Sequence, residues 1–423
     1  MALFYDFLIA VLGLLALPKI AYQYVFKGRY RGYFAQRFGF SLPTLKKTNK
    51  KLIWIHAVSL GETKAMLPLA KELYESVEDC EIVISSGTET GHHEALKGAP
   101  FARQIFLPPD FSWNMRYLMK NANPELVILV ETDFWYQFLR LAKLQGAKIA
   151  LVNGKISMTS ARRHQIFPFF MRTIFSFIDL FAVQNIDYKN RFSDLGVPLE
   201  KLNITGNLKF DAPLQLMDVN EKHSFLNRLG IPQDDPVIVA GSTHESEEDI
   251  VLEAMKSVWE LHPKATLLLV PRHPERFRSV EMLLQKRNIL FSRFTDSNPK
   301  PNSQVILVDA MGVLKQCYQI SALSIVAGSF IPQVGGHNIL EPSSYGVPVI
   351  FGPFMQAQPE LLELALNHEV GVQTNEKELG KVLINLLHDS TMRKHLGDNG
   401  RALVLANQGA TKKTRDLLKT LLQ

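Results

Sequence analysis

Charged side chains that could carry out proton transfer or stabilise charge stand directly after apolar runs of this chain. Glu62 follows the run Leu52–Val58, where it could act as a general base toward a hydroxyl or simply complement the dipole of the next helix. Glu131 follows Leu126–Val130 and could stabilise positive charge that develops on a substrate. Lys209 comes after an apolar run and a glycine turn, so its ammonium could reach a cleft between domains or remain a surface charge.

A glycine-rich stretch in the second half, Val334–Pro342 (VGGHNILEP), has the composition of an anion site. Gly335 and Gly336 allow a tight turn and a close approach of the backbone to a ligand. If Asn338 caps the following helix, the free N–H groups of its first turn could hold a phosphate. Glu341 lies three residues further on, where it could accept hydrogen bonds from sugar hydroxyls or bond back to the Asn338 backbone as a capping box.

Two further segments of the second half could contact a nucleotide. Arg272 follows the apolar run Thr266–Val270, and its planar guanidinium could hold a phosphate or the edge of a base. Asp309–Val313 offers backbone groups and the soft side chain of Met311, which could pack on a nucleobase or begin a buried helix.

Small polar residues in the first half could line an acceptor pocket or cap helices. They are Ser59, Gly61, Ser86, Gly87 and Thr88. The surroundings of Ser59 do not have the GxSxG pattern, which argues against a serine hydrolase. The basic and aromatic segment Ala161–Phe175, which contains Arg162, is either a solvated helix face or a contact with phosphate and membrane.

These residues need a scaffold, and the order of apolar runs predicts one. Short strand-like runs alternate with amphipathic helical segments from Lys51 onward, which predicts parallel sheets covered by helices on both faces. The rhythm stops in the proline-containing stretch Ala212–Asp235 and restarts at Val237, so we place a domain boundary there. Ligands of such sheets bind beyond the carboxyl ends of the strands, where the chemistry-bearing residues stand.

Composition limits the alternatives. The 423 residues are 46% hydrophobic and 21% charged, as in a folded protein of more than one domain. Two cysteines are too few for a disulfide scaffold, and the 12 histidines show no metal-ligand spacing, so we expect no metal site. The net charge of +6 suits an anionic membrane surface, a phosphorylated substrate or nucleic acid.

The amino-terminal segment is apolar, with Phe7–Leu17 uninterrupted by polar residues. Its positive charges follow the apolar run instead of preceding it, unlike those of a signal peptide. Two interpretations stay open: a single tilted span whose basic end is cytoplasmic, or a helix that lies in the membrane interface. The other alternative is a buried first helix of a soluble domain. The basic and aromatic stretch Lys27–Arg37 could contact lipid head groups or nucleic acid, and the preceding apolar segment favours lipid.

The motifs taken together resemble the bacterial Kdo transferases, which move 3-deoxy-D-manno-octulosonic acid (Kdo) from CMP-Kdo to lipid A precursors at the inner membrane. The resemblance runs in order over nearly the whole chain. It rests on the apolar amino-terminal segment and on His56–Glu62, Glu131–Trp135, Val152–Ser157, Thr205–Asp211, Gly241–His244, Pro271–Phe277, Asp309–Gly312 and Gly335–Pro342.

This resemblance implies an α/β fold of the GT-B type, with two Rossmann-like domains facing across a cleft. We expect a membrane anchor at 1–26, an acceptor-binding domain at 27–215, a nucleotide-sugar-binding domain at 216–400, and a carboxy-terminal helix at 401–423 that packs back toward the seam between the domains.

The resemblance also implies roles for individual residues. Glu62 would be the general base, and Glu131 and Lys209 would stabilise the transition state. Contacts to CMP would come from Pro271 and Arg272, from Met311, Gly312 and Val313, and from Gly335, Gly336, Asn338, Ile339, Leu340 and Glu341. Five positions depart from the common pattern, at Leu60, Tyr136-Gln137, Lys155 and Ile339, and the changes beside Trp135 could alter the fit of the acceptor.

The expected activity is therefore metal-independent transfer of Kdo from CMP-Kdo to a lipid A precursor, with inversion at the anomeric carbon and without a cofactor. The expected location is the cytoplasmic leaflet of the inner membrane, with an amino-terminal anchor, a cytoplasmic catalytic body and no nucleic-acid partner. Two alternatives are a GT-B envelope enzyme that uses a UDP-sugar and a non-enzymatic, membrane-bound nucleotide- or lipid-binding protein.

Overall fold

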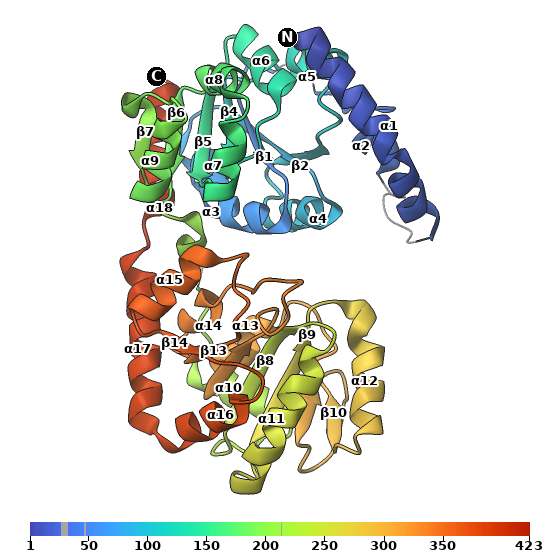
Figure 1. Ribbon diagram of the computed structural model, residues 1–423, viewed down its shortest axis with the longest axis vertical. Coiled ribbons are helices and arrows are strands. Elements are labelled where there is room, and N and C mark those ends of the chain that lie inside the picture. Colours follow the sequence, from blue (N-terminus) through green and yellow to red (C-terminus); the bar gives the residue numbers. More distant parts are fainter. Residues whose placement is uncertain (27–32, 46–47, 213) are drawn as a thin grey trace. The chain divides into compact units, whose positions relative to one another are not determined.

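The computed structural model describes residues 1–26, 33–45, 48–212 and 214–423, and it divides into two compact units (Figure 1). The first unit is Met1–Pro213 together with Asn407–Gln423, and the second is Leu214–Ala406. The chain therefore passes between the units twice.

The first unit is built on one parallel sheet. Among the described residues it has seven strands in the order β3-β2-β1-β4-β5-β6-β7. The strands are β1 (Lys51–Ala57), β2 (Cys80–Ser86), β3 (Arg103–Phe106), β4 (Leu126–Val130), β5 (Lys148–Gly154), β6 (Leu180–Val183) and β7 (Leu202–Ile204). The helices are α1 (Ala2–Phe26), α2 (Phe34–Arg37), α3 (Leu60–Ser76), α4 (Glu89–Gly98), α5 (Ser112–Ala122), α6 (Tyr136–Leu144), α7 (Met158–His164), α8 (Pro168–Phe177), α9 (Ile186–Asp194), α18 (Ala410–Leu421) and the 3₁₀ turns Leu199–Lys201 and Leu208–Asp211.

Both faces of this sheet are buried, because successive side chains of a strand point to opposite faces. In β4, Val127 and Leu129 pack with helices α5, α6, α8 and α9, whereas Leu126 and Ile128 pack with α3, α4 and α18. A continuous apolar run such as LVILV is the pattern that a strand buried on both faces requires, and the predicted strand has the observed bounds.

The second unit repeats this plan. Its described residues form a seven-stranded parallel sheet in the order β10-β11-β9-β8-β12-β13-β14. The strands are β8 (Val237–Thr243), β9 (Thr266–Pro271), β10 (Phe291–Arg293), β11 (Val305–Leu307), β12 (Leu323–Val326), β13 (Val349–Phe351) and β14 (Gly371–Gln373). The helices are α10 (Val219–Arg228), α11 (Glu247–Leu261), α12 (Phe277–Lys286), α13 (Leu314–Gln319), α14 (Leu340–Ser343), α15 (Pro359–Asn367), α16 (Leu379–His388), α17 (Ser390–Ala406) and the 3₁₀ turn Pro274–Arg276.

The two predicted Rossmann-like folds are thus confirmed, and each sheet has a point where the strand order reverses. In the first unit it lies between β1 and β4, and in the second between β8 and β12. In open α/β sheets the loops at the carboxyl ends of the strands diverge at such a point, and ligands bind there; we call this region the crevice of each sheet. The sequence does not predict the short strands β10 and β14, which stand at sheet edges and have three residues each. The apolar run expected before Lys209 is the edge strand β7, which is equally short.

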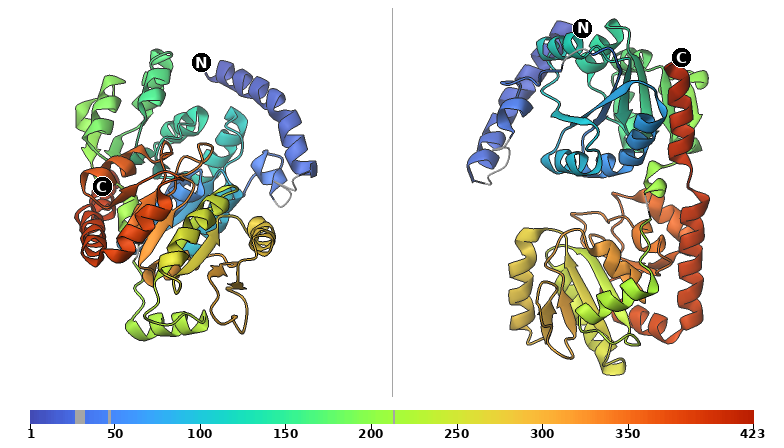
Figure 2. Two further views of the ribbon diagram at one scale, coloured as in Figure 1. Left: turned by 60° about the horizontal axis from the view of Figure 1, so that its bottom comes forward. Right: turned by 180° about the vertical axis from the view of Figure 1, so that it is seen from behind.

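The predicted apolar amino-terminal segment forms one helix, α1, that is long and apolar enough to cross a membrane. Most of its large side chains are exposed, so the alternative of a buried first helix was wrong. Residues 27–32 of the basic stretch Lys27–Arg37 lie outside the described residues. Figures 1 and 2 show α1 beginning beside α5 and α6.

The single carboxy-terminal helix expected at 401–423 is two helices. Helix α17 ends at Ala406 in the second unit, and α18 begins at Ala410 in the first, packed against α3 and the turn Leu208–Asp211. Gly409 has a φ of 98°, which favours glycine, and the Asp211 carboxylate accepts the N–H groups of Gly409 and Thr411 at the start of α18. This cap from a distant part of the chain explains why the apolar pattern alone did not reveal the break.

Candidate functional site

Glu62 lies in the first turn of α3, directly beyond the carboxyl end of β1. Its side chain is buried, and its two carboxylate oxygens accept hydrogen bonds from the Val58 N–H at 2.7 Å and the Ser59 hydroxyl at 2.7 Å. Ser59 caps α3 and accepts from the Glu62 N–H in return. Glu62 therefore helps to begin the helix, as one alternative held, and these contacts also fix its carboxylate in one position.

Glu131 is the centre of an ion-pair cluster beyond β4, across the crevice from β1 in the same sheet. Its carboxylate pairs with Lys155 Nζ at 2.6 Å and with Lys209 Nζ at 3.2 Å. Lys209 is therefore a partly buried member of this cluster, and the alternative of an unpaired surface lysine does not hold. The Asn153 side chain also donates to Glu131 at 3.4 Å, and its own Oδ1 accepts the Leu208 N–H, which ties the turn that carries Lys209 to the end of β5.

The backbone of Glu131 supports a functional interpretation. Its φ is 68°, in the left-handed region that a residue with a long side chain rarely adopts. Such a conformation costs on the order of 1–3 kcal/mol and is found mostly where the surrounding structure enforces it at functional sites. The Glu131 N–H bonds to the Val152 carbonyl, so the strand edge holds the residue in this conformation.

The three acids of this crevice differ in electrostatic state. Burial raises the pKa of Glu62, and the charge of Glu131 adds to this effect against the hydrogen bonds that lower it. Burial acts in the same direction on Glu131, but the ammonium groups of Lys209 and Lys155 outweigh it and lower the pKa of that carboxyl. Burial, followed by the charges of Glu62 and Glu131, raises the pKa of Asp133 to about 6. The pKa of one acid is thus lowered while the pKa values of the other two are raised, a separation typical of acid–base chemistry.

The remaining acceptor-side residues have mixed outcomes. The Thr88 hydroxyl caps α4 and donates to the Val58 carbonyl, so the capping alternative holds for it. A Cβ on Gly87 would approach a Val58 side-chain carbon to 2.7 Å, which explains the glycine by close packing of the two strand ends. Ser86 is buried, Gly61 is exposed in the first turn of α3, and Arg162 is exposed on α7. The structure brings Ser59 alone of this set into contact with the Glu62 carboxylate among the described residues.

The departure from the family pattern at Tyr136-Gln137 has a structural role. Tyr136 and Gln137, at the start of α6, are buried and contact α1, so they hold the amino-terminal helix. Asn153 and Lys155 belong to the motif Val152–Ser157, but the sequence does not predict what either side chain does. Their position after the strand β5 was visible, but their partners were not.

In the second unit, a group of cationic and imidazole side chains lies at the reversal point. His244 follows β8, and its Nε2 is 2.8 Å from Nε2 of His337 in the glycine-rich loop. The rings stack with a centroid distance of 5.1 Å, and His273 packs edge-on against His244. Burial, with the charges of neighbouring histidines and of Arg272, lowers the pKa of His244 to about 4 and that of His337 to about 3. Both imidazoles are therefore neutral at pH 7 unless an anion binds beside them.

Arg272 lies next to this pair, directly after β9, as predicted. Its guanidinium makes no hydrogen bond or ion pair with any other residue that the structure describes, whereas the nearby Arg276 pairs with the buried Glu248 at 3.0 Å. Arg272 thus offers an unpaired planar cation at a strand end, which is the arrangement that recognises a phosphate.

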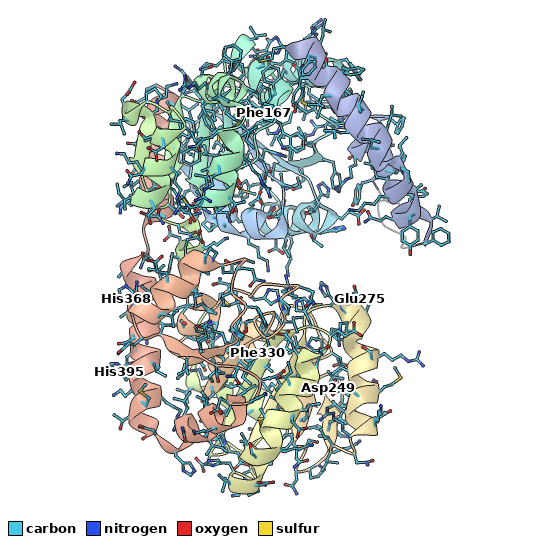
Figure 3. All side chains as sticks on the ribbon, viewed as in Figure 1. Phe167, Asp249, Glu275, Phe330, His368 and His395 are labelled. Carbon is cyan, nitrogen blue, oxygen red and sulfur yellow. The ribbon has the colours of Figure 1, made fainter. Side chains whose placement is uncertain are left out.

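A buried carboxylate braces the same crevice. Glu247 accepts N–H groups from Gly328, Phe330 and His244, so it ties the loop after β12 to the loop after β8 (Phe330 is marked in Figure 3). Gly328 has a φ of 75°, and a Cβ there would lie 2.7 Å from the His337 ring. Sequence analysis did not single out Glu247, whose role depends on loops about 80 residues away.

The expected phosphate site at a helix amino terminus differs from the prediction. Helix α14 spans only Leu340–Ser343, and Ile339 occupies its N-cap position. The Asn338 side chain accepts the Leu340 N–H at 3.0 Å, as the cap that the sequence predicts would do. Among the described residues, Glu341 makes no hydrogen bond back to the Asn338 backbone, so the capping-box alternative does not hold. Glu341 instead lies near Tyr318 and Tyr345, and its charge adds to burial in raising their pKa values.

The other predicted donor residues lie on neighbouring loops. Pro271 pairs with Thr243 in the sheet register, and Gly335 and Gly336 both have positive φ beside the residues Met355–Ala357. Met311 and Gly312 are exposed, and Val313 precedes α13, which contacts α14. Ile339 is fully buried, so its side chain serves packing.

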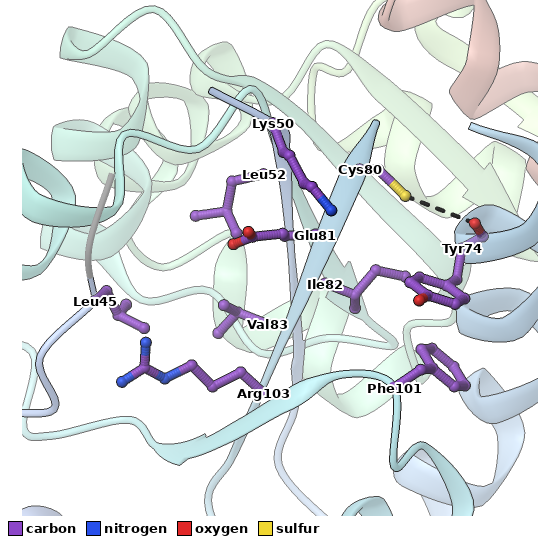
Figure 4. A pocket seen from close by; sticks show the side chains of 10 residues that line it. All are labelled: Leu45, Lys50, Leu52, Tyr74, Cys80, Glu81, Ile82, Val83, Phe101 and Arg103. Carbon is purple, nitrogen blue, oxygen red and sulfur yellow. Dashed lines mark hydrogen bonds between the residues drawn. The ribbon is translucent and has the colours of Figure 1, made fainter. Parts of the chain in front are cut away.

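A separate cavity of about 290 Å³ lies near the amino ends of β1, β2 and β3 in the first sheet (Figure 4). Lys50, Glu81 and Arg103 contribute charges, and Cys80, Phe101 and Tyr74 form its inner wall. Glu62 and Glu131 lie beyond the carboxyl ends of β1 and β4, so this cavity is separate from them. Among the described residues, no group of His, Cys, Asp and Glu side chains is arranged to hold a metal ion.

Comparison with known proteins places these sites in a family. A protein of Chlamydia muridarum named 3-deoxy-D-manno-octulosonic acid transferase is 34% identical to this chain over 419 residues, covering 98% of this chain and 96% of its own. This chain belongs to the Kdo transferase family. The family member of that name from Haemophilus influenzae is 34% identical over 435 residues, covering 99% of this chain and 98% of its own.

The two halves of this Kdo transferase family member also match family descriptions separately. Residues 33–212 match 3-deoxy-D-manno-octulosonic-acid transferase, and residues 222–403 match glycosyl transferases group 1. The chain is thus a glycosyltransferase. Its fold resembles UDP-GlcNAc 2-epimerase from Neisseria meningitidis, with a TM-score of 0.61 and 14% identity over 88% of this chain and 99% of the other. The glycosyltransferase of Rickettsia africae has a TM-score of 0.59 at 16% identity, covering 89% and 100% of the two chains. These similarities establish the GT-B fold.

Proposed function

We propose that this enzyme transfers Kdo from CMP-Kdo to a lipid A precursor at the cytoplasmic face of the inner membrane, with inversion of configuration. The observation that carries the proposal is the cluster of Glu62, Glu131 and Lys209 at the reversal point of the first sheet, in a chain that belongs to the Kdo transferases. The relatives' name supports the sugar, and the family's sequence motifs support CMP as the nucleotide.

Glu62 is proposed to take the proton from the acceptor hydroxyl as that oxygen attacks the anomeric carbon of Kdo. Its raised pKa makes it a better proton acceptor than an exposed carboxylate, and its contacts with Val58 and Ser59 fix the oxygens in place. A single displacement without an enzyme nucleophile inverts the anomeric carbon. The acceptor O–H bond and the bond between the anomeric carbon and the phosphate oxygen of CMP break. The glycosidic bond forms, and the proton passes to Glu62.

The leaving group defines what the other charges do. Kdo departs from a nucleoside monophosphate, so no diphosphate needs a metal clamp, and the negative charge that develops is that of one phosphate. Arg272 is proposed to hold this phosphate, with His244 and His337 beside it. Lys209 and Glu131 are proposed to stabilise the transition state, in which charge separates between sugar and phosphate.

Product masses provide the direct test. The purified full-length enzyme is incubated with labelled CMP-Kdo and a lipid A precursor, and the lipid products are weighed by mass spectrometry. We expect the precursor to gain the mass of one or more Kdo residues. An unchanged precursor with intact CMP-Kdo would contradict the proposal.

Arg272→Ala is expected to weaken CMP binding roughly 10- to 100-fold, because a charged hydrogen-bonding partner of the phosphate is lost. Calorimetry with CMP measures the effect, and Arg278→Ala, at an exposed arginine of α12, serves as the matched control. The same titration with UDP separates the nearest alternative: tight UDP binding without CMP binding would favour a UDP-sugar donor.

Glu131→Gln is expected to move the acid limb of the pH profile of kcat/KM to lower pH, besides lowering the rate. A base must be ionised to act, so activity falls as the pH drops through the raised pKa of Glu62. The pKa of Glu131 is lowered, so its charge is present while Glu62 titrates, and removing that charge lowers the pKa of Glu62. The limb should stay in place in Asp187→Asn, an exposed acid of α9. An unshifted limb in Glu131→Gln would argue against Glu62 as the titrating base.

A further inference from the structure

The apolar helix α1 is attached to the first unit at its very beginning. Within Ala2–Phe26, all of which is described, Asp6 is the buried residue. Asp6 Oδ1 accepts the Ser112 N–H and the Gln137 side-chain N–H, each at 3.0 Å. Gln137 also donates to the Ala2 carbonyl at 3.0 Å.

A second bond in the same turn reinforces this attachment. The Tyr5 hydroxyl donates to Asp110 Oδ2 at 2.9 Å, and Asp110 accepts the Gln137 and Phe138 N–H groups at the start of α6. The Tyr5 ring packs against Tyr136 at a centroid distance of 5.1 Å. We call Ala2, Tyr5, Asp6, Asp110 and Gln137 the anchor latch. The carboxylate, hydroxyl and amide groups of the anchor latch hydrogen-bond to one another, and moving them into lipid would break these hydrogen bonds.

The other end of α1 is also held at the first unit. The Tyr24 ring lies 5.1 Å from the Phe34 ring, and the neighbouring Tyr33 packs on Phe106 of β3 at 4.7 Å. The chain from Phe26 to Tyr33 reaches at most about 25 Å when fully extended. The hydrocarbon core of a bilayer is about 30 Å thick. The end of α1 therefore lies on the same side of a membrane as the folded unit.

The middle of α1 requires lipid around it. Leu12, Leu14, Leu15 and Leu17 are all exposed, and at 100° per residue they point to different sides of the helix. Helix α1 thus needs an apolar surrounding along its length, while both of its ends are fixed to a body that stands outside the bilayer.

We propose that α1 lies lengthwise within the one membrane leaflet that faces the catalytic body, with the anchor latch holding its amino terminus on the same side of the membrane as its carboxy terminus. This inference rests on the membrane attachment in the proposed function and adds its topology. A helix that crossed the bilayer would have to open the latch and carry Asp6 to the far side. An in-plane helix keeps the first unit against the surface from which a lipid acceptor would come.

Thiol labelling of the full-length chain tests this topology. One form carries a short cysteine-containing extension before Met1, and a control form carries Lys412→Cys on the exposed surface of α18. Both native cysteines are buried, so their background labelling is low. A membrane-impermeant maleimide is applied to intact spheroplasts and to inverted inner-membrane vesicles from cells that express each form.

We expect both forms to sediment with the membranes and to be labelled in the inverted vesicles alone. Labelling of the amino-terminal cysteine in spheroplasts, with Lys412→Cys labelled in inverted vesicles, would overturn the in-plane topology while leaving membrane attachment intact. Recovery of the protein in the soluble fraction would overturn the attachment and the inference with it.

A variant of the anchor latch tests whether its contacts keep the amino terminus of α1 on the side of the catalytic body. The double change Asp6→Leu with Gln137→Leu removes the buried polar contacts and makes α1 more apolar. We expect a severalfold rise in labelling of the amino-terminal cysteine in spheroplasts, with circular dichroism confirming that the sheets stay folded. Labelling that remains confined to inverted vesicles would refute the role of the latch.

Discussion

Glu62→Gln is expected to lower Kdo transfer by about 10²- to 10⁴-fold, the usual contribution of a positioned general base. The amide keeps an oxygen that can accept the Val58 N–H, so the cap of α3 is largely retained and the helix should still form. Glutamine is therefore a sharper replacement than alanine, which would also remove the capping contact. Single-turnover transfer and thermal unfolding of the same preparation measure the two properties.

Asp187→Asn is the matched control for this experiment. Asp187 is an acid in the first turn of α9, exposed and outside the cluster, so it acts on the helix dipole alone. Its replacement should leave transfer unchanged. Near-normal transfer by Glu62→Gln would refute the base assignment and would mean that another group removes the proton.

Lys209→Ala is expected to lower the rate of transfer by roughly 10²- to 10³-fold, in the range observed when one preorganised stabilising group is removed. Lys155→Ala distinguishes a direct effect of Lys209 on the reaction from an indirect one through the charge of Glu131, because both ammonium groups pair with the Glu131 carboxylate. If Lys209 stabilises the transition state, the kcat of Lys209→Ala falls far below that of Lys155→Ala.

Equal losses in the two lysine variants would mean that Lys209 serves only to keep Glu131 ionised. Each ammonium lowers the pKa of Glu131 against the effect of burial, so either replacement raises that pKa. In that case the losses should recover at higher pH, where Glu131 ionises without a partner. A loss in Lys209→Ala that persists at high pH supports a direct role in the reaction.

Much of the scaffold could be predicted from local pattern. The run LVILV has the length and continuous apolarity of a strand buried on both faces, and β4 has the predicted bounds. Such runs also predicted that Glu62, Glu131 and Arg272 stand at carboxyl ends of parallel strands. A residue that follows a strand lies beyond its carboxyl end, whatever the position of that strand in the sheet. The three-residue edge strands β10 and β14 were not predicted because they are too short to show a pattern.

What the sequence could not determine was which distant groups meet. The imidazole of His244 meets that of His337 across 93 positions of the chain, and the side chain of Gln137 meets Asp6 across 131. Asp211 caps a helix that begins some 200 residues later, which divides the expected carboxy-terminal helix in two.

The amino-acid sequence by itself thus determined two Rossmann-like sheets and the strand-end positions of the candidate catalytic residues. Tertiary structure decided that Lys155 joins Lys209 on Glu131, that Gln137 holds α1, and that Glu247 connects the loops of the second crevice. The physical reason is that apolar periodicity acts between neighbours in sequence, whereas hydrogen bonds, ion pairs and desolvation depend on distances in space that only the packed chain sets.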